Sequence, residues 1–343
     1  MIGYQASHEQ FSPRELLRLA KLAERAGFEA IHSSDHFHPW SERQGQSGFS
    51  FAWLGAAMQA THIPFGMICA PGPRYHPAII AQACATLQQM FPRRLWVTLG
   101  SGEALNEVIT GSTWPEKKIR NERLHEAAQI IRRLFTGEEV SHDGHFTTHR
   151  ARLYTLPKTP PALLGAALSA ETAALHGTWA DGLLITANDP ASAGKLIQAF
   201  RENGGAGKPI YFKFQLSYAR DLTVAQEGAY EQWRNNILPQ HLLASLQHVS
   251  DFDAAGEDVT REEVNQRLPI SDDPLFFKTK IQAFQEAGCD HIMLHNVNRR
   301  QEDFIEDFGK AFFRSRRTAT DYAGVDRPSA GSRDTGADND PVK

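Results

Sequence analysis

The chain has 343 residues, 41% of them hydrophobic and 22% charged, so it can bury a sizeable core and is not disordered throughout. Its formal net charge of −4 gives no bulk attraction to nucleic acid or to an anionic membrane. Because it has three scattered cysteines, no signal-peptide pattern and no membrane-spanning run of about 18 apolar residues, we expect a cytoplasmic protein without membrane or nucleic-acid partners.

The first half of the chain alternates between helix-like and strand-like segments. Residues 13–26 place Leu16, Leu19 and Ala23 on one helical stripe, and Gly27 ends that helix. Short apolar runs that indicate strands are residues 29–34, 65–69 and 95–99. Each run is followed by a loop rich in polar residues, glycine or proline, and a long amphipathic helix is expected at about 121–135.

The second half continues this alternation. Further expected elements are strands at 162–167, 182–186, 210–217 and 291–295 and helices beginning near Ser169 and covering 278–287 and 301–313. The 210–217 segment alternates cleanly: Phe212 and Phe214 share one face, and Tyr211, Lys213 and Gln215 share the other. In a barrel the apolar face packs on helices, and polar residues near the strand end can line the site.

This alternation predicts an α/β fold, namely a (β/α)8 TIM barrel that forms a single domain over residues 1–315. Residues 221–274 are mostly helical and polar, so we interpret them as a helical insertion into the barrel. Residues 316–343 contain no Leu, Ile, Phe or Trp, and we expect a disordered C-terminal tail there.

Catalytic groups of such barrels gather at the C-terminal ends of the strands. The loops expected there are residues 35–40, 70–77, 100–103 and 165–169. We expect these loops, which carry His36, Arg74, Glu103 and Ser169, to open onto one pocket.

His36 has two interpretations. A neutral imidazole accepts a proton near pH 7, and the adjacent Asp35 could orient it, but both residues could instead cap a turn. His36 and His38 also form the HxH pair that metal-dependent barrel hydrolases use. Only His295 offers a further histidine at a strand end, so we expect no metal and keep hydrolysis as an alternative.

Other residues of these loops also allow two interpretations, one functional and one structural. Gly102 would let a ligand approach the backbone beside Glu103, whereas Glu103 alone could simply complement a helix dipole. Ser169 is a good N-cap and could equally help to bind a phosphate. Trp40 could form a wall of the site or pack beside Pro39.

Four blocks together resemble the luciferase-like superfamily, and specifically its branch of glucose-6-phosphate dehydrogenases that use the deazaflavin coenzyme F420. These blocks are GYQASHEQFSPREL, SDHFHPW, RYHPAIIAQACATL and GSGEALNEVITG. The resemblance runs from Gly3 to about Phe313 and implies a flavin-dependent oxidoreductase that transfers hydride or activates oxygen on a small organic molecule. By analogy with the superfamily we also expect a homodimer.

The resemblance also implies residue roles. His36 would remove a substrate hydroxyl proton while hydride leaves the adjacent carbon. Trp40 and Glu103 would stabilise or protonate the reduced cofactor, and Glu9 would belong to the same polar shell. Residues implied to contact the cofactor are Asp35, Met67, Ile68, Cys69, Ala70, Gly102, Asn106, Ala167, Leu168 and Ser169.

The chain departs from the sugar-phosphate branch in several places. Leu168 and Ser169 replace paired glycines, and near Asp189 this chain lacks a lysine with which that branch binds the substrate phosphate. A second such lysine lies in a segment missing before Ser271, and Lys280 stands where that branch has an arginine. We therefore do not expect glucose 6-phosphate as the substrate. Because no basic cluster is evident for an F420 tail, the sequence favours FMN, with F420 as the alternative cofactor and a non-catalytic flavin-binding protein as the alternative function.

Overall fold

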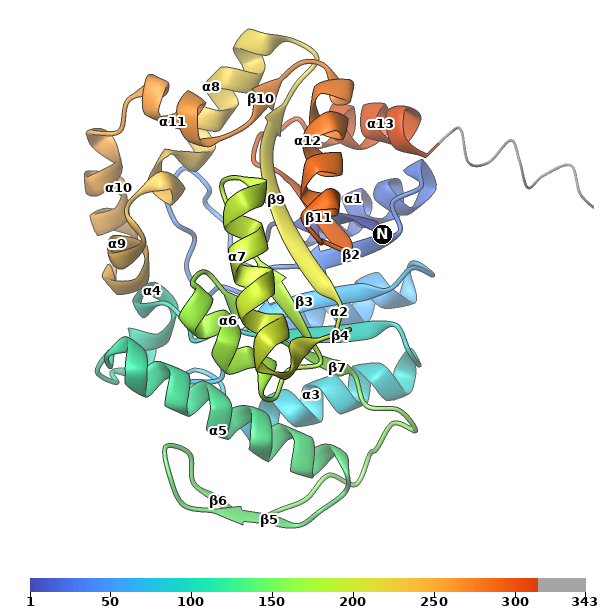
Figure 1. The fold of residues 1–343 in the computed structure, drawn as a ribbon, viewed down its shortest axis with the longest axis vertical. Helices are drawn as coiled ribbons and strands as arrows, with labels where there is room; N and C mark the ends of the chain where they lie inside the picture. The colour runs from blue at the N-terminus through green and yellow to red at the C-terminus, as the bar shows by residue number, and fades with distance from the viewer. Residues whose placement is uncertain (314–343) are drawn as a thin grey trace, which may run out of the picture.

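The computed structural model describes residues 1–313, so the tail predicted for 316–343 lies outside the described residues. Within them, eight parallel strands form a closed barrel (Figure 1). In order around the barrel, they are β1 (Ile2–Ala6), β2 (Ala30–Ser33), β3 (Phe65–Cys69), β4 (Leu95–Leu99), β7 (Ala162–Ala167), β8 (Gly182–Ile185), β9 (Ile210–Tyr218) and β11 (His291–Asn296). β9 pairs with both β8 and β11, and β11 pairs with β1, which closes the ring. The predicted (β/α)8 barrel is confirmed.

Helices cover the outside of this barrel. They are α1 (Pro13–Ala26), α2 (Ser50–Gln59), α3 (Pro77–Met90), α5 (Lys117–Phe135), α6 (Ala170–Gly177), α7 (Pro190–Phe200), α12 (Pro274–Glu286) and α13 (Gln301–Phe312). Capping side chains begin several of them: Ser12, Ser169 and Asp189 each accept a hydrogen bond from a first-turn backbone N–H. Helix α5 starts at Lys117, before the predicted Asn121, so its basic first turn extends toward the loops.

One element was missed by the sequence reasoning. Between α5 and β7 the chain forms an antiparallel hairpin of β5 (Val140–His142) and β6 (Thr148–Ala151). Figure 1 shows it beyond α5, at the edge of the molecule. The Asp143-Gly144 pair between these strands is a turn signal that could have revealed it.

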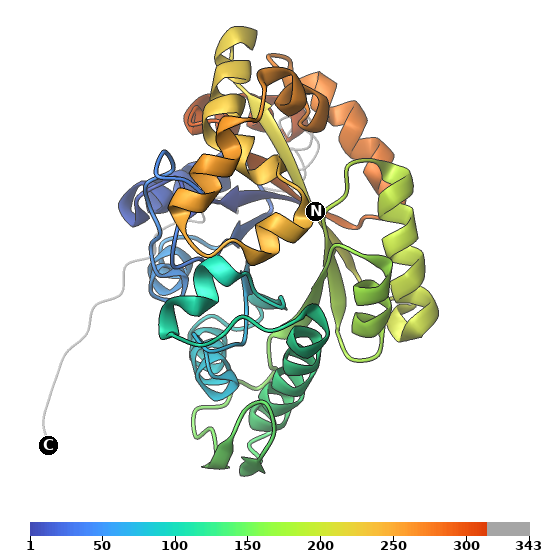
Figure 2. The same ribbon diagram turned by 90° about the vertical axis from the view of Figure 1, so that its left-hand side faces the viewer.

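The segment between β9 and α12 is mostly helical, as expected of the insertion. It consists of α8 (Leu222–Trp233), a 3-10 turn (Arg234–Ile237), α9 (Gln240–Ser245), α10 (Val249–Glu257), α11 (Arg261–Arg267) and the short strand β10 (Ile270–Ser271), which pairs with β9. In Figure 2 these yellow and orange helices lie together on one side of the barrel, close to the short helix α4 (Ala104–Glu107). Trp233 packs with Val297 and Phe252 packs with Leu105, so the insertion rests on the loops that follow β11 and β4.

Successive side chains along each strand point alternately to the outside and to the inside of the barrel, which gives an outer and an inner core. Ile31, Val97 and Phe212 belong to the large apolar core between strands and helices. Inside the barrel, Ala30, Trp96, Leu164 and Met293 form a small apolar cluster. Inward-facing positions nearer the C-terminal strand ends are polar, and they include His32, Thr98, Lys213 and His295. Within residues 1–313, no helix is both long enough and apolar enough to span a bilayer.

Gly66 on β3 shows how tightly the inner cluster is packed. A Cβ atom at this position would lie 2.1 Å from Cε2 of the Trp96 indole, whereas a Cβ at Gly194 within α7 would meet no atom within 4 Å. We expect Gly66→Ala to lower the free energy of unfolding by about 1–3 kcal/mol through overpacking. The matched change Gly194→Ala should raise it by about 0.5–1 kcal/mol, because alanine favours helix. Urea unfolding of both variants checks this, and a neutral Gly66→Ala would contradict the packing.

Burial of neutral histidines predicts a second, pH-dependent effect. Burial lowers the pKa of His32 to about 3 and that of His176 to about 4. Each imidazole therefore binds its proton more readily in the unfolded chain, so its contribution to stability is complete above pH 6.5 and is lost as the pH falls toward the folded pKa.

We expect the free energy of unfolding to fall by about 1.4 kcal/mol per pH unit for each such histidine between pH 6.5 and its folded pKa. His176→Gln should remove the contribution of one histidine from this dependence of the unfolding free energy on pH. His149 is exposed, so His149→Gln should leave the dependence unchanged. Urea unfolding at several pH values measures the slopes. Equal slopes for wild type and His176→Gln would rule out this account.

Candidate active site

His36 lies between two carboxylates that come from different loops. Its Nδ1 is 3.6 Å from Oε1 of Glu9, which follows β1, and its Nε2 is 3.7 Å from Oε2 of Glu103, which follows β4. The His36 side chain is 14% exposed, so solvent reaches it. The barrel thus brings together three side chains that lie 27 or more residues apart in the sequence.

The two carboxylates differ in their surroundings. Burial tends to raise the pKa of Glu9, but the charges of His36 and Lys213 and a hydrogen bond from Ser7 lower it to about 2. The hydroxyls of Ser7 and Ser34 donate to Oε2 of Glu9 at 2.7 and 2.8 Å. Glu9 is therefore a fixed anion at neutral pH.

The pKa of Glu103 is shifted in the opposite direction, upward. Burial raises its pKa, His36 and Lys213 oppose that rise, and the charge of Glu9 adds to it. Its side chain is still 34% exposed, so Glu103 can exchange a proton with solvent more readily than Glu9 can.

Asn106 joins the loops that carry His36 and Glu103. Its Oδ1 accepts hydrogen bonds from the backbone N–H groups of Phe37 and His38 at 2.8 and 3.1 Å. Its Nδ2 donates to Oε2 of Glu103 at 3.3 Å. Gly102, with φ of +80°, makes the left-handed turn that leads into Glu103. The Asn106 amide is thus engaged within the protein, and its expected contact with the cofactor stays a prediction.

Trp40 forms one wall beside His36, with 5.2 Å between the ring centroids. The insertion holds it there: Phe252 meets the indole edge-on at 5.2 Å, and Nδ2 of Asn235 donates to the Trp40 carbonyl at 3.2 Å. The helical insertion therefore shapes this side of the site.

Asp35 does not face the opening with its side chain. The carboxylate is fully buried, and it accepts hydrogen bonds from Arg74 Nη2 at 3.0 Å and from the Tyr75 hydroxyl at 3.2 Å. Arg74 Nε also lies 3.4 Å from Glu107 Oε1. Burial raises the pKa of both Asp35 and Glu107, and Arg74 opposes the rise in each case. This ionic network ties the loops after β2, β3 and β4 together behind His36.

The predicted cofactor residues of β3 divide by strand alternation. Met67 and Cys69 belong to the outer core, while Ile68 lies on the inner face, near Gly100 of the loop after β4. Only Ile68 and Ala70 can therefore offer side chains to a ligand inside the barrel, and Met67 and Cys69 can offer only backbone.

The loop after β7 lies beside α5. Ser169 caps α6 by accepting a hydrogen bond from Thr172 N–H at 3.3 Å, and Lys117 Nζ donates to the same hydroxyl at 3.3 Å. Ala167 is buried and Leu168 is 58% exposed. The loops of His36, Arg74 and Glu103 are joined by direct contacts, whereas Ser169 is linked to α5, so a pocket shared by all four stays a prediction.

Two lysines were not among the predicted site residues. Lys117 lies beside the Ser169 loop, which only the earlier start of α5 reveals, and it also pairs with Glu171 of α6 at 3.7 Å. Lys213 is half-buried inside the barrel, where the alternation of β9 placed it. His38, by contrast, directs Nδ1 to the Leu105 carbonyl at 3.0 Å, so the two rings of the HxH pair have separate partners.

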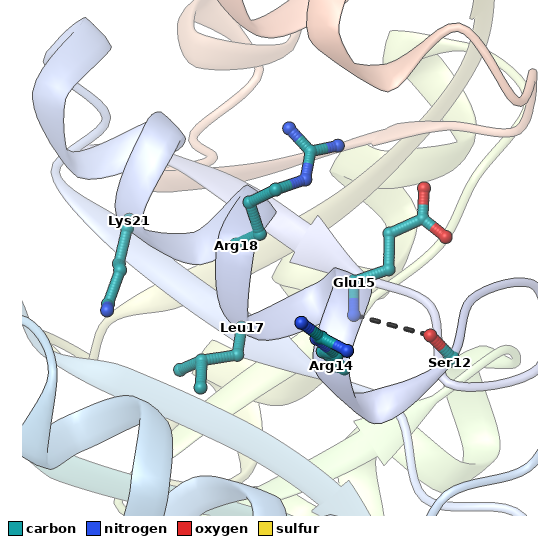
Figure 3. A pocket seen from close by; sticks show the side chains of 6 residues that line it. All are labelled: Ser12, Arg14, Glu15, Leu17, Arg18 and Lys21. Atoms are coloured by element: carbon teal, nitrogen blue, oxygen red, sulfur yellow. Dashed lines mark hydrogen bonds between the residues drawn. The ribbon is translucent and has the colours of Figure 1, made fainter.

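A surface hollow of about 510 Å³ lies along α1 (Figure 3). Its lining residues are Ser12, Arg14, Glu15, Leu17, Arg18 and Lys21. Ser12 is engaged as the cap of α1, and Arg18 is paired with Glu302 at 2.6 Å. Because all of its lining residues lie on or just before one helix, and none was predicted for the site, the candidate active site is the His36 cluster.

Comparison with known proteins gives concordant results. The model of the family described as luciferase-like monooxygenase matches residues 2–291. An F420-dependent glucose-6-phosphate dehydrogenase of Rhodococcus erythropolis is 35% identical over 322 residues, which cover 90% of this chain and 95% of the relative. The enzyme of the same name from Mycolicibacterium smegmatis is 34% identical, with the same coverage of both chains.

Among solved structures, an F420-dependent secondary alcohol dehydrogenase in complex with an F420-acetone adduct is similar. It has a TM-score of 0.84 and 31% identity, and the match covers 90% of this chain and 97% of the other. The F420-dependent tetrahydromethanopterin reductase from Methanopyrus kandleri, with a TM-score of 0.73 and 20% identity, shares the fold.

The buried network around Arg74 yields a stability prediction. Arg74→Met leaves the Asp35 and Glu107 carboxylates buried without their cation, and we expect a loss of about 3–5 kcal/mol in unfolding free energy. Arg18→Met, which removes the partner of the exposed Glu302, should cost less than about 1 kcal/mol. Urea unfolding at pH 7 compares the two, and equal losses would contradict a structural role for Arg74.

Proposed function

The chain belongs to the luciferase-like monooxygenase family, and from this premise we propose that it is an F420-dependent dehydrogenase of small alcohols. That it is an oxidoreductase follows from relatives that are named as F420-dependent dehydrogenases and match it over 90% of its length. The observation that carries the finer proposal is the position of His36 between Glu9 and Glu103. The homodimer expected above stays a prediction, since the structure describes one chain.

His36 is the residue that takes the hydroxyl proton of the substrate. Its Nδ1 faces Glu9, a permanent anion, which favours a proton on Nδ1 and leaves the Nε2 lone pair facing Glu103 and the open side. When Nε2 accepts the substrate proton, Glu9 stabilises the resulting imidazolium. Glu103, whose pKa is raised and whose side chain is partly exposed, can then receive a proton from Nε2 and release it to solvent.

The residues around this cluster suit a deazaflavin. Gly102 presents backbone without a side chain, and Ile68 and Trp40 supply apolar surface for a flat ring. Ser169 and Lys117 would hold the phosphate and the acidic tail at the start of α6. When bound, F420 supplies an acceptor for hydride from the carbinol carbon. Lys117 is paired with Glu171 at 3.7 Å, so its charge alone does not select the cofactor, and the relatives named as F420-dependent favour F420 over FMN.

A small alcohol fits better than a sugar phosphate. Asp189 is the N-cap of α7 and bonds Ser192, so the position near which the sugar-phosphate branch has a lysine carries a negative charge. Lys280 lies over the Phe276 ring at 4.9 Å. The similar solved structure of a secondary alcohol dehydrogenase supports the same choice of substrate class.

The test uses purified chain with F420 or FMN and a panel of primary and secondary alcohols. We expect F420 binding, detected by fluorescence, and alcohol-dependent loss of F420 absorbance. His36→Ala should lower kcat by about 100- to 10,000-fold while cofactor binding stays near that of wild type. The exposed His62→Ala is the matched control.

Two outcomes would refute parts of this proposal. Full turnover by His36→Ala would remove His36 as the base. Binding of FMN with no binding of F420 would overturn the cofactor assignment and return the chain to the flavin chemistry that its sequence favoured.

A further inference from the structure

The barrel interior below His36 contains polar atoms that have no partner within residues 1–313. They come from inward-facing positions on three strands, and their side chains are at least nine-tenths buried. These atoms are His32 Nε2 on β2, Trp96 Nε1 and Thr98 Oγ1 on β4, and His295 Nδ1 on β11. Leaving a buried polar group without a hydrogen bond is costly, so four on one interior surface indicate a ligand that can bond to them.

Hydrogen bonds to neighbouring amides fix what these atoms can do. His32 Nδ1 lies 2.7 Å from Gln5 Oε1, an acceptor, so it carries the proton and Nε2 keeps a lone pair. His295 Nε2 lies 3.3 Å from Gln10 Oε1, which leaves the lone pair on Nδ1. Burial lowers the pKa of both imidazoles, which keeps both rings neutral.

Lys213 lies on the same interior surface. It follows Tyr211 on the inner face of β9, opposite Met293 of β11, and it is half-buried. It makes no hydrogen bond or ion pair with any residue of the described chain, although it acts electrostatically on Glu9, Glu103, His32 and His295. The three N–H groups of this half-buried ammonium need hydrogen-bond partners, and water can supply them.

We propose that this interior layer is a hydrated chamber, and that Lys213, bridged by the waters it holds, supplies the charge that lets Glu9 and Glu103 flank His36. Water suits the chamber because the layer mixes donors, Lys213 and Trp96, with the lone pairs of two neutral histidines. Neither an anion nor a cation could satisfy both kinds of group.

The charged and titratable groups around Lys213 show which repulsion its positive charge offsets. Lys213 interacts electrostatically with Glu9 in the loop after β1, with Glu103 in the loop after β4, and with His32 and His295 on β2 and β11. His36 stands above, between the two carboxylates, while β3, β7 and β8 contribute no titratable side chain to the inner face. Two anions close to one imidazole repel each other, and a second cation offsets that repulsion. The effect of Lys213 on catalysis rests on the proposed function, whereas the hydration of the chamber and the charge balance do not.

The first test needs no cofactor or substrate. In chain labelled with 13C at glutamate Cδ and in histidine rings, NMR titration follows Glu9, Glu103, His32 and His295. Lys213→Met should move the Glu9 and Glu103 titrations upward by about one pH unit, and those of His32 and His295 in the same direction. Lys213→Arg should leave them near wild type, and the exposed Lys195→Met is the control. Unchanged titrations in a folded Lys213→Met would overturn the electrostatic role.

The second test is a high-resolution crystal structure of the purified chain. Ordered waters that bond His32 Nε2, His295 Nδ1 and Lys213 Nζ are expected. If Lys213 instead bonds a protein group directly, or the chamber holds a bound anion, the hydration proposal fails.

If Lys213→Met does not fold, the titration of the first test is repeated with Lys213→Gln, which also removes the charge. Inactivity toward alcohols would count against the proposed function alone, because neither measurement requires turnover.

Discussion

Closure of the strand ring is the constraint on which the site depends. β9 pairs with β8 on one side and β11 on the other, and β11 returns to β1. Because all eight strands run parallel, every loop that follows a strand emerges at the same end. Glu9, His36 and Glu103 meet only for this reason, since no local sequence contact joins them. Within the closed ring, the alternation of β9 places Lys213 on the inner face, beside Met293 of β11.

Two groups of charged side chains lie at this end of the barrel, one buried behind His36 and one beside it. Behind His36, Arg74 sits between Asp35 and Glu107 and joins three loops into one rigid unit. Buried ion pairs of this kind are costly to form and more costly to break, so they specify geometry more than they add stability. Because that network already satisfies Asp35, its carboxylate is withheld from the opening. The titratable side chains that remain beside the opening of these loops include His36 and its two flanking glutamates.

The sequence predicted the barrel because alternating strand and helix patterns are a local property of the chain. It also placed His36 and Glu103 in loops that follow expected strands, and the structure brings these side chains to 3.7 Å, while their roles stay predictions. It could not predict that Asn106 joins these loops, because that bond depends on the tertiary approach of residues 68 or more positions apart. Lys117 was missed for a related reason: helix propensity does not fix where α5 begins, and the earlier start places this charge beside Ser169.

The two carboxylates beside His36 are unequal, and this inequality gives the site a direction. Glu9 receives two hydroxyl hydrogen bonds and is buried, so it holds its negative charge and orients Nδ1. Glu103 receives one amide hydrogen bond and is a third exposed, so a proton can reside there and leave. A symmetric pair would share a proton without preference. In the proposed reaction, the proton accepted at Nε2 would have one acceptor on the open side, and the buried side would remain an anion throughout.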